Sequence, residues 1–209
     1  MIVFVIVNKK IMTIINVVHG DIQMRVSRED ARENRARVVE TASQLFRQHG
    51  FDGIGIAGLM KASGLTNGAF YKQFASKDAL MAEATSHALT ENLDHWRRSV
   101  AEDASGSPED TIAHWYLSET HESARGTGCA YAALAGDAPR QTKEVRQAFD
   151  EALRETAALV SGKDETTPLS EQEDAFKFIS QMVGALVLAR ATEDPELKTA
   201  LLNAARKTE

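Results

Sequence analysis

Apolar residues recur at helical spacing along the first part of this chain. In residues 27–48 they fall three or four positions apart, which places them on one face of an α-helix. These positions are Val38, Ala42, Leu45 and Phe46. Ser27 and Asp30 form an S-x-x-D capping box at the start, and Gly50 follows the end. The pattern predicts a first helix from residue 27 to about residue 48.

Three further helices are predicted before residue 101, separated by glycine or by a capping residue. Residues 53–64 predict a short second helix that ends at a glycine. Thr66 can cap a third helix over residues 67–74, and Ser76 can cap a longer fourth helix over residues 77–100. Short helices joined by a glycine turn are typical of a helix-turn-helix unit. The residues expected to form its small core are Val38, Leu45, Phe46, Ile56, Leu59, Leu65, Phe70 and Phe74.

The rest of the chain predicts a larger helical body. Ser107 and Pro108 form a cap and a first-turn proline for a helix that runs to about residue 124. Further helices are expected over residues 144–160, over residues 169–192 and from residue 195 onward. Runs rich in β-branched and aromatic residues are missing after residue 24, so the predicted fold class is all-α.

Composition narrows the classes of protein that fit. A single cysteine, Cys129, excludes an intramolecular disulfide and is typical of a reducing cytoplasm. No segment reaches the roughly 20 apolar residues that span a bilayer, so we expect no membrane partner. Residues 1–23 contain short apolar runs around Lys9 and Lys10. We interpret them as a disordered or mis-started extension, with Met24 as the natural start, in preference to a targeting segment.

Charge is distributed unevenly along the chain. Residues 24–80 carry nine Lys and Arg against six Asp and Glu, a net charge of +3. Residues 81–209 carry 13 against 23, a net charge of −10. An acidic protein can still bind a polyanion through a local basic surface, because the salt-dependent part of binding depends on the contacting groups. The pattern indicates a basic head and an acidic body.

The stretch VVETASQLFRQHGFDGIGIAGLMKASGLTNGAFYKQFASKDAL resembles the N-terminal DNA-binding domain of tetracycline-repressor-type (TetR/AcrR) regulators. The matching features are a first helix ending in LF-x-x-x-G-[FY], the G-x-[FY]-[YF]-x-x-F signature and the SK-[DE]-x-L segment. One feature departs from the family: Ile54 and Gly55 stand where a capping Ser or Thr is usual, which puts one phosphate contact in doubt.

The resemblance implies two domains. Residues 24–80 would be the DNA-binding domain, with its helix-turn-helix motif at about residues 55–74. Residues 81–209 would be a helical domain for ligand binding and dimerisation.

The third helix is the expected reading helix, because the second helix of a helix-turn-helix enters the major groove. Thr66, Asn67 and Ala69 lie where side chains meet base edges, and Gly68 allows close approach of the backbone. Tyr71 and Lys72, with Lys77 and Arg35, are candidate phosphate contacts. Other interpretations stay open: Thr66 as a cap alone, Tyr71 as half-buried packing, and Arg35 as a solvated side chain.

The resemblance also implies a small-molecule cavity in the body. The candidate lining residues are His87, Trp96, Trp115, Tyr116, Tyr131, Phe149, Phe176 and Met182. Each could instead be ordinary core. Cys129 joins this set, because it follows Gly128 near a predicted helix start where a thiolate would be stabilised. It is either a sensor of electrophiles and oxidants or a small buried residue.

A homodimer is expected, because one reading head binds weakly alone. The candidate interface residues are Ile179, Val183, Leu186, Val187, Leu197 and Leu201. The same apolar stripe could be internal core.

The predicted function is therefore a ligand-responsive repressor that binds a palindromic operator in double-stranded DNA as a homodimer and is released by a small-molecule effector. A helical small-molecule-binding module without DNA function is the alternative from another class. An enzyme is not expected, because HExxH, GxGxxG, P-loop and GxSxG motifs are missing. His114 and His121 have no partners for a metal site in the sequence and are expected to be exposed, so we expect no metal and no cofactor.

Overall fold

The computed structural model describes residues 28–103 and 107–206. The expectations for residues 1–23, for Met24 and for the capping residue Ser27 lie outside the described residues. Within the described ranges the chain is all-helical, which confirms the predicted fold class. The helices are α1 (Arg28–His49), α2 (Ile56–Ala62), α3 (Asn67–Phe70), α4 (Lys77–Glu102), α5 (Pro108–Tyr116), α6 (Glu119–Ser123), α7 (Ala130–Leu134), α8 (Lys143–Ser161), α9 (Glu173–Ala191) and α10 (Pro195–Arg206), with 3-10 turns η1 (Ala138–Arg140) and η2 (Leu169–Glu171).

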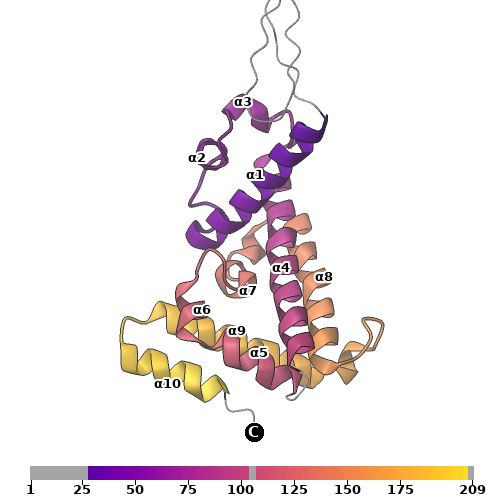
Figure 1. The fold of residues 1–209 in the computed structure, drawn as a ribbon, viewed down its shortest axis with the longest axis vertical. Helices are drawn as coiled ribbons and strands as arrows, with labels where there is room; N and C mark the ends of the chain where they lie inside the picture. The colour runs from indigo at the N-terminus through magenta and orange to yellow at the C-terminus, as the bar shows by residue number, and fades with distance from the viewer. Residues whose placement is uncertain (1–27, 104–106, 207–209) are drawn as a thin grey trace, which may run out of the picture.

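The head consists of α1, α2 and α3, and it lies at the narrow end of the molecule (Figure 1). Its core is the predicted one. Val38, Phe46, Leu59, Phe70 and Phe74 are buried, while Leu45, Ile56 and Leu65 pack against them and are partly buried. Gly64 adopts a φ of 71° in the turn between α2 and α3, a conformation that favours glycine. The turn thus fixes how α3 leaves α2.

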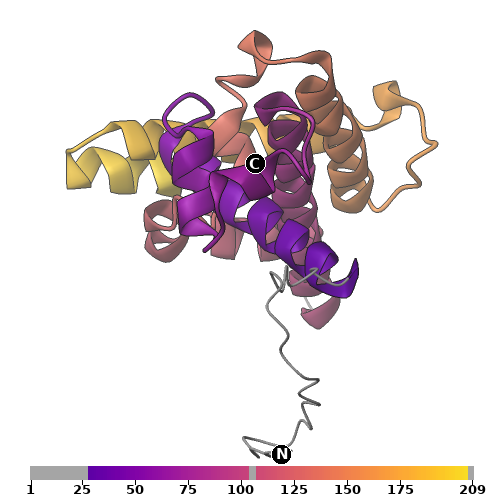
Figure 2. The same ribbon diagram turned by 90° about the horizontal axis from the view of Figure 1, so that it is seen from above.

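The long helix α4 joins the head to the body. It packs against α1 near its start and against α8 along the body (Figure 1). At the broad end, α9 packs against α10, and both views show α10 at the periphery (Figures 1 and 2). One hydrophobic core runs from the head into the body through α4. A movement of the head would therefore also affect the packing of the body.

The predicted capping residues are found at two helix starts. The Ser76 hydroxyl accepts a hydrogen bond from the Ala79 N–H at 3.0 Å at the start of α4. The Ser107 hydroxyl accepts one from the Asp110 N–H at 3.1 Å, and Pro108 is the first residue of α5. Both caps satisfy N–H groups that a helix start leaves free.

The two helices of the motif are shorter than predicted. The second begins at Ile56 instead of residue 53, because residues 51–54 form a bend after α1. The third ends at Phe70 instead of residue 74, because the Gln73 and Phe74 N–H groups both bond back to Phe70 O in a turn.

Two helices of the body are interrupted. The helix expected from Pro108 to about residue 124 ends at Tyr116, since Ser118 caps a separate helix, α6, by accepting from the His121 N–H at 3.2 Å. The helix expected over residues 169–192 is divided into η2 and α9. The interruption after Tyr116 brings α6 under the head.

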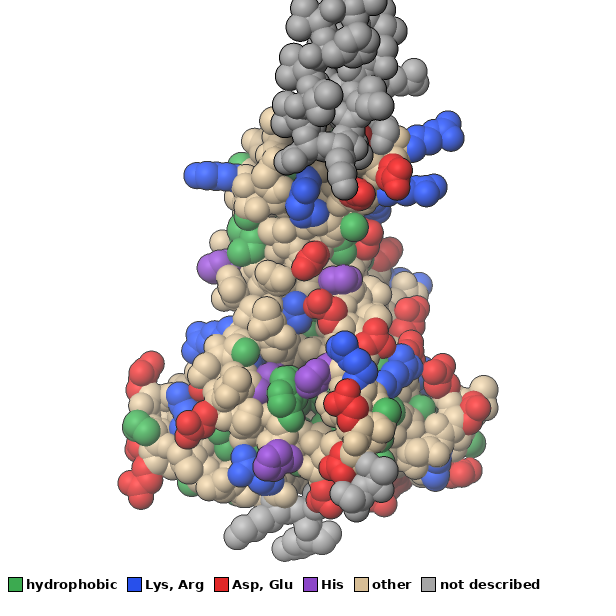
Figure 3. Space-filling model, viewed as in Figure 1, with side chains coloured by type: hydrophobic (Ala, Val, Ile, Leu, Met, Phe, Trp, Pro, Cys, Tyr) green, Lys and Arg blue, Asp and Glu red, His purple; other side chains and the backbone are tan. Residues whose placement is uncertain are grey.

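Charged side chains follow the division between head and body. Figure 3 shows Lys and Arg around the narrow end, whereas most Asp and Glu in that view lie on the body. None of the described helices is long and apolar enough to cross a membrane.

Candidate nucleic-acid interface and its connection to the body

The start of α3 presents polar side chains to solvent. Thr66, Asn67, Gly68 and Lys72 are exposed, and Ala69 is partly exposed. The opposite side of the helix is anchored by Phe70, which is fully buried. Thr66 makes no side-chain capping hydrogen bond, so its hydroxyl is not used at the helix start. The start of α3 thus offers the Thr66 hydroxyl and the Asn67 amide, and the turn after α3 adds the Lys72 ammonium.

Tyr71 projects from the head. Its side chain is 71% exposed, and its ring meets the buried Phe70 ring edge-on, with centroids 5.2 Å apart. Half-buried packing therefore does not describe this residue. A tyrosine held by its ring edge can direct its hydroxyl outward, as a phosphate contact requires.

Arg35 and Lys77, two of the predicted phosphate contacts, are engaged within the head. Arg35 pairs with Glu83 of α4 at 2.6 Å, donates to Gln73 O at 2.9 Å and lies over the Phe74 ring. The Lys77 ammonium donates to Phe51 O at 2.6 Å. Both side chains are therefore held by bonds within the protein, and a phosphate contact by either one would come in addition to these bonds.

The start of α2 lacks a side-chain cap. Gly55 is the N-cap residue and makes no side-chain hydrogen bond. The departure from the family pattern noted in the sequence is therefore real in the structure, and the N–H groups at this helix start keep their capacity to bind a phosphate.

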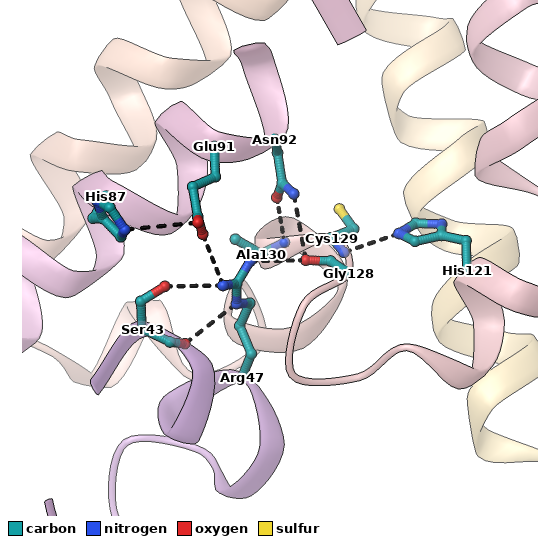
Figure 4. Close-up of polar contacts among 9 residues, drawn as sticks. All are labelled: Ser43, Arg47, His87, Glu91, Asn92, His121, Gly128, Cys129 and Ala130. Atoms are coloured by element: carbon teal, nitrogen blue, oxygen red, sulfur yellow. Dashed lines mark hydrogen bonds and ion pairs between the residues drawn. The ribbon is translucent and has the colours of Figure 1, made fainter. Parts of the chain in front are cut away.

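A buried arginine connects the head to the body (Figure 4). The Arg47 side chain is 2% exposed, and its Nη2 bonds to Glu91 of α4 at 2.9 Å and to the Ser43 hydroxyl at 3.0 Å. Its Nη1 donates to Gly128 O at 3.1 Å, and its Nε donates to Ser43 O at 3.2 Å. A single guanidinium thus joins α1, α4 and the loop before α7.

Asn92 of α4 fixes the same loop from the other side. Its Nδ2 donates to Gly128 O at 3.3 Å, and its Oδ1 accepts from the Ala130 N–H at 2.6 Å. A Cβ at Gly128 would collide with Ala124 O and lie 2.9 Å from Arg190 Nη2, so only glycine allows this approach. Side chains of the head and of α4 therefore hold the backbone of this loop and fix its position.

His121 is buried beneath this loop, so the expectation that it is exposed is wrong. It is 1% exposed and packs against Trp115 and Tyr116. Its Nε2 accepts from the Cys129 N–H at 3.0 Å, so the proton sits on Nδ1, which donates to Tyr116 O at 2.7 Å. Burial lowers the pKa of His121 to about 4, and the nearby Arg190 charge acts in the same direction. The ring is therefore neutral at pH 7. His114 is exposed, as expected.

Cys129 is the N-cap residue of α7. Its thiol is buried, and the sulfur accepts from the Ala132 N–H at 3.5 Å. Burial raises the pKa of Cys129, although hydrogen bonds with Tyr116 and Ala132 oppose that shift. The resting side chain is a protonated thiol without access to solvent.

A cavity of about 520 Å³ lies where the head meets the body. It is lined by Gln44 and Arg47 of α1, residues of α4, Trp115 of α5 and Thr127. Trp115 is the one member of the predicted ligand set that borders it. Of the rest, Phe176 is partly buried, His87 is partly exposed beside Glu91, and the remaining side chains are packed in the core: Trp96, Tyr116, Cys129, Tyr131, Phe149 and Met182.

Comparisons with known proteins agree with this geometry. Residues 38–84, which include α2, α3 and the turn between them, match the family described as bacterial regulatory proteins, tetR family. This segment of the chain therefore matches the TetR family. It is 26% identical over 142 residues to the HTH-type transcriptional repressor NemR of Escherichia coli K12, which covers 65% of this chain and 69% of NemR. It is 35% identical over 76 residues to the HTH-type transcriptional regulator TtgR of Pseudomonas putida, 36% of each chain.

Solved structures share the fold of this chain. The reduced form of E. coli NemR superposes with a TM-score of 0.66 at 21% identity, covering 83% of this chain and 95% of NemR. A TetR-family regulator from Agrobacterium tumefaciens superposes with a TM-score of 0.63 at 18% identity, covering 84% and 97%. These similarities extend the shared fold from the head into the body.

The proposed dimer residues divide into two groups. Ile179 and Leu186 are buried inside the subunit, because they point from α9 toward the core. They cannot supply an exposed contact. Val187 of α9 and Leu197 of α10 are 42% and 50% exposed, and Leu188, which the sequence did not single out, is 56% exposed. Val183 and Leu201 are partly buried.

The sequence pattern did not predict the residues that connect the head to the body. Arg47, Glu91 and Asn92 are separated from their partners by 36 to 81 positions, and helical periodicity carries no information at that distance. One local signal was available: Arg47 directly follows the core residue Phe46 near the end of the first helix. A cation at such a position requires buried acceptors.

Proposed function

We propose that this chain is a transcriptional repressor that binds a palindromic operator as a homodimer. The observation that carries the proposal is the exposed polar face of α3, with Thr66, Asn67 and Gly68 at its start and Phe70 buried behind them. Such a helix can enter the major groove with its first residues at the base edges. NemR, which is similar over about two thirds of the chain, is a transcriptional repressor and supports this assignment.

Each exposed group has a role in the proposed complex. The Asn67 amide can form a bidentate pair with adenine, which makes it the reading residue. The Tyr71 hydroxyl and the Lys72 ammonium meet phosphates and hold the helix in position. Ala69 is placed to contact a thymine methyl group. Arg35 and Lys77 act mainly by stiffening the head through their internal bonds.

Dimerisation through α9 and α10 completes the proposed reader. Val187 and Leu188 of α9 and Leu197 of α10 are exposed apolar side chains, and contact with a second copy would remove them from water. Helix α10 lies at the periphery of the body (Figure 2). The two heads of such a dimer would contact successive turns of the major groove on one side of the duplex. Because the dimer is symmetric, a palindrome is the expected target.

Release by a small-molecule effector is the regulatory part of the proposal. The Arg47 bonds to Glu91 and Gly128 O give the head a defined position relative to the body. An effector that binds another head position more tightly would shift the population away from the DNA-binding state. The thiol-sensing alternative through Cys129 has weaker support, because that thiol is buried and its pKa is raised.

Enrichment of binding sites from a random DNA duplex pool tests the proposal. The wild-type chain should enrich a palindrome with half-sites about one helical turn apart. Asn67→Ala should enrich a sequence relaxed at one position in each half-site, whereas Lys72→Ala should keep the sequence and lose affinity at every salt concentration. Lys177→Ala, an exposed lysine on α9, is the matched control. A folded wild-type chain that enriches no sequence contradicts the proposal.

A further inference from the structure

The cavity between head and body has a composition suited to one class of ligand. Its wall combines the two α1 residues Gln44 and Arg47 with a row on α4 and with Trp115 and Thr127. The α4 row consists of Glu91, Asn92, Asp94, His95, Arg97 and Arg98. With about 520 Å³, the space is large enough for a ligand of one or two rings.

The charges on this wall leave one cation unmatched. Glu91 is already paired with Arg47 at 2.9 Å, and Arg97 is paired with Asp94 at 3.4 Å and with Glu155 of α8 at 3.2 Å. Among the described residues, Arg98 has no ion pair, and its Nε donates to the backbone oxygen of Asp94 at 3.2 Å. The wall thus has three guanidinium groups and two carboxylates.

His95 does not change this balance at neutral pH. Burial lowers its pKa, and the Arg98 charge lowers it further, whereas Glu102 acts in the opposite direction. The ring is neutral at pH 7. Arg98 is therefore the guanidinium of this wall that one anionic group on a ligand can pair with.

The same wall offers an apolar surface of fixed position. The Trp115 ring lies 4.0 Å from the His95 ring and 4.3 Å from the His121 ring, measured between centroids. His121 is in turn held by hydrogen bonds at both ring nitrogens. A preorganised aromatic side chain beside a free guanidinium can accommodate a planar ring that carries an anionic group.

We propose that this cavity binds a small aromatic carboxylate, with its anionic group at Arg98 and its ring against Trp115. The inference rests on the proposed function, because it names the class of effector and the place where it acts. A carboxylate is favoured because a guanidinium binds its two oxygens together.

Such a ligand would act on the connection between head and body. Arg47 is both a wall of the cavity and the residue that joins α1 to Glu91 and Gly128 O. A ligand ring against Trp115 occupies space between α1 and α5, where the Arg47 bonds hold the head. This occupancy favours a head position different from the ligand-free one.

Isothermal titration of the full chain, without DNA, tests the binding site. The probes are 2-naphthoate, its neutral analogue 2-naphthamide and the cationic 2-naphthylmethylammonium. The expected result is one naphthoate per chain, with binding at least about tenfold weaker for the amide and weaker still for the cation. Equal affinity for the three probes, or no binding of naphthoate at millimolar concentration, overturns the proposal.

Two matched variants locate the binding. Arg98→Gln should weaken naphthoate binding about tenfold without loss of stability, because Arg98 is exposed. Arg154→Gln, an exposed arginine on α8 away from the cavity, should leave binding unchanged. Equal effects of the two variants overturn the assignment to this cavity.

The outcome is separable from that of the proposed function. Naphthoate binding by a chain that enriches no DNA sequence would keep the cavity and contradict the regulator. Operator binding by a chain that ignores naphthoate would keep the regulator and contradict the cavity. Naphthoate that binds at Arg98 should also weaken the operator complex of the wild-type chain and not that of Arg98→Gln, and an unaffected complex contradicts the effector role.

Discussion

At the residue scale, Arg47 is the side chain on which the connection between head and body depends. It is buried, and its partners come from its own helix, from α4 and from the loop before α7. Such a group is tolerated in an interior only when its N–H groups are hydrogen-bonded. Its removal leaves Glu91 and the Ser43 hydroxyl without their strongest donor. The substitution should therefore lower the stability of the fold as well as release the head from the body.

Arg47→Met should lower the free energy of unfolding by about 2 kcal/mol, because buried bonds to a charged group are lost while Glu91 stays partly hydrated. Urea unfolding followed by circular dichroism measures this free energy of unfolding. The exposed Arg154→Met should change stability by less than about 0.5 kcal/mol. An equally small effect of the Arg47 substitution would contradict its structural role.

His121 should make stability depend on pH in a defined window. Its pKa is about 4 in the folded chain and 6.5 ordinarily, so the unfolded chain binds more protons between these values. Stability should be complete above pH 6.5 and should fall by up to about 3 kcal/mol as the pH drops to 4. Urea unfolding at several pH values measures this loss. In His121→Gln the loss over this window should be smaller, and an identical pH profile would show that His121 does not contribute.

Cys129 should react slowly in the folded chain. Only the thiolate attacks a maleimide, and here the thiol is buried with a raised pKa. Mass spectrometry should therefore detect little N-ethylmaleimide adduct under native conditions and complete labelling in denaturant. Rapid native labelling would instead favour the thiol-sensing alternative.

At the element scale, α3 and α9 illustrate what a local pattern can and cannot specify. The glycine turn and the possible cap at Thr66 predicted α3, and Phe70 was correctly assigned to the core. The length of α3 was wrong, because the backbone bonds to Phe70 O that form the following turn leave no trace in side-chain periodicity. In α9, the sequence could not separate Leu186, which is buried, from Val187, which is exposed, because both flanks of this helix are apolar.

The exposed surface of α9 and α10 should control the association state. Leu188→Glu should convert a dimer to a monomer, because it would place a charge in the proposed apolar contact. Sedimentation equilibrium measures the mass. Leu169→Glu, a substitution of another exposed leucine outside α9 and α10, should leave the dimer intact. Dimers that persist in both variants would place the interface elsewhere.

At the scale of the whole molecule, the sequence predicted the class of fold and the position of the head well, and the site only in part. The motif around Gly64 to Lys77 is local, so short-range patterns suffice to find it. The cavity is assembled from α1, α4, α5 and the loop at Thr127, which are distant in sequence. Of the predicted ligand set, only Trp115 reaches it, because aromatic residues fill the core by the same apolar spacing that would line a pocket.

The central claim is that two copies of α3 read one palindrome in DNA. Hydroxyl-radical footprinting of the wild-type chain on DNA flanking its own gene tests it most directly. The account predicts two protected segments about one helical turn apart on one face of the duplex, and loss of both in Tyr71→Ala without loss of folding, since this side chain is 71% exposed. Uniform cleavage across that DNA by a folded, dimeric chain would contradict it.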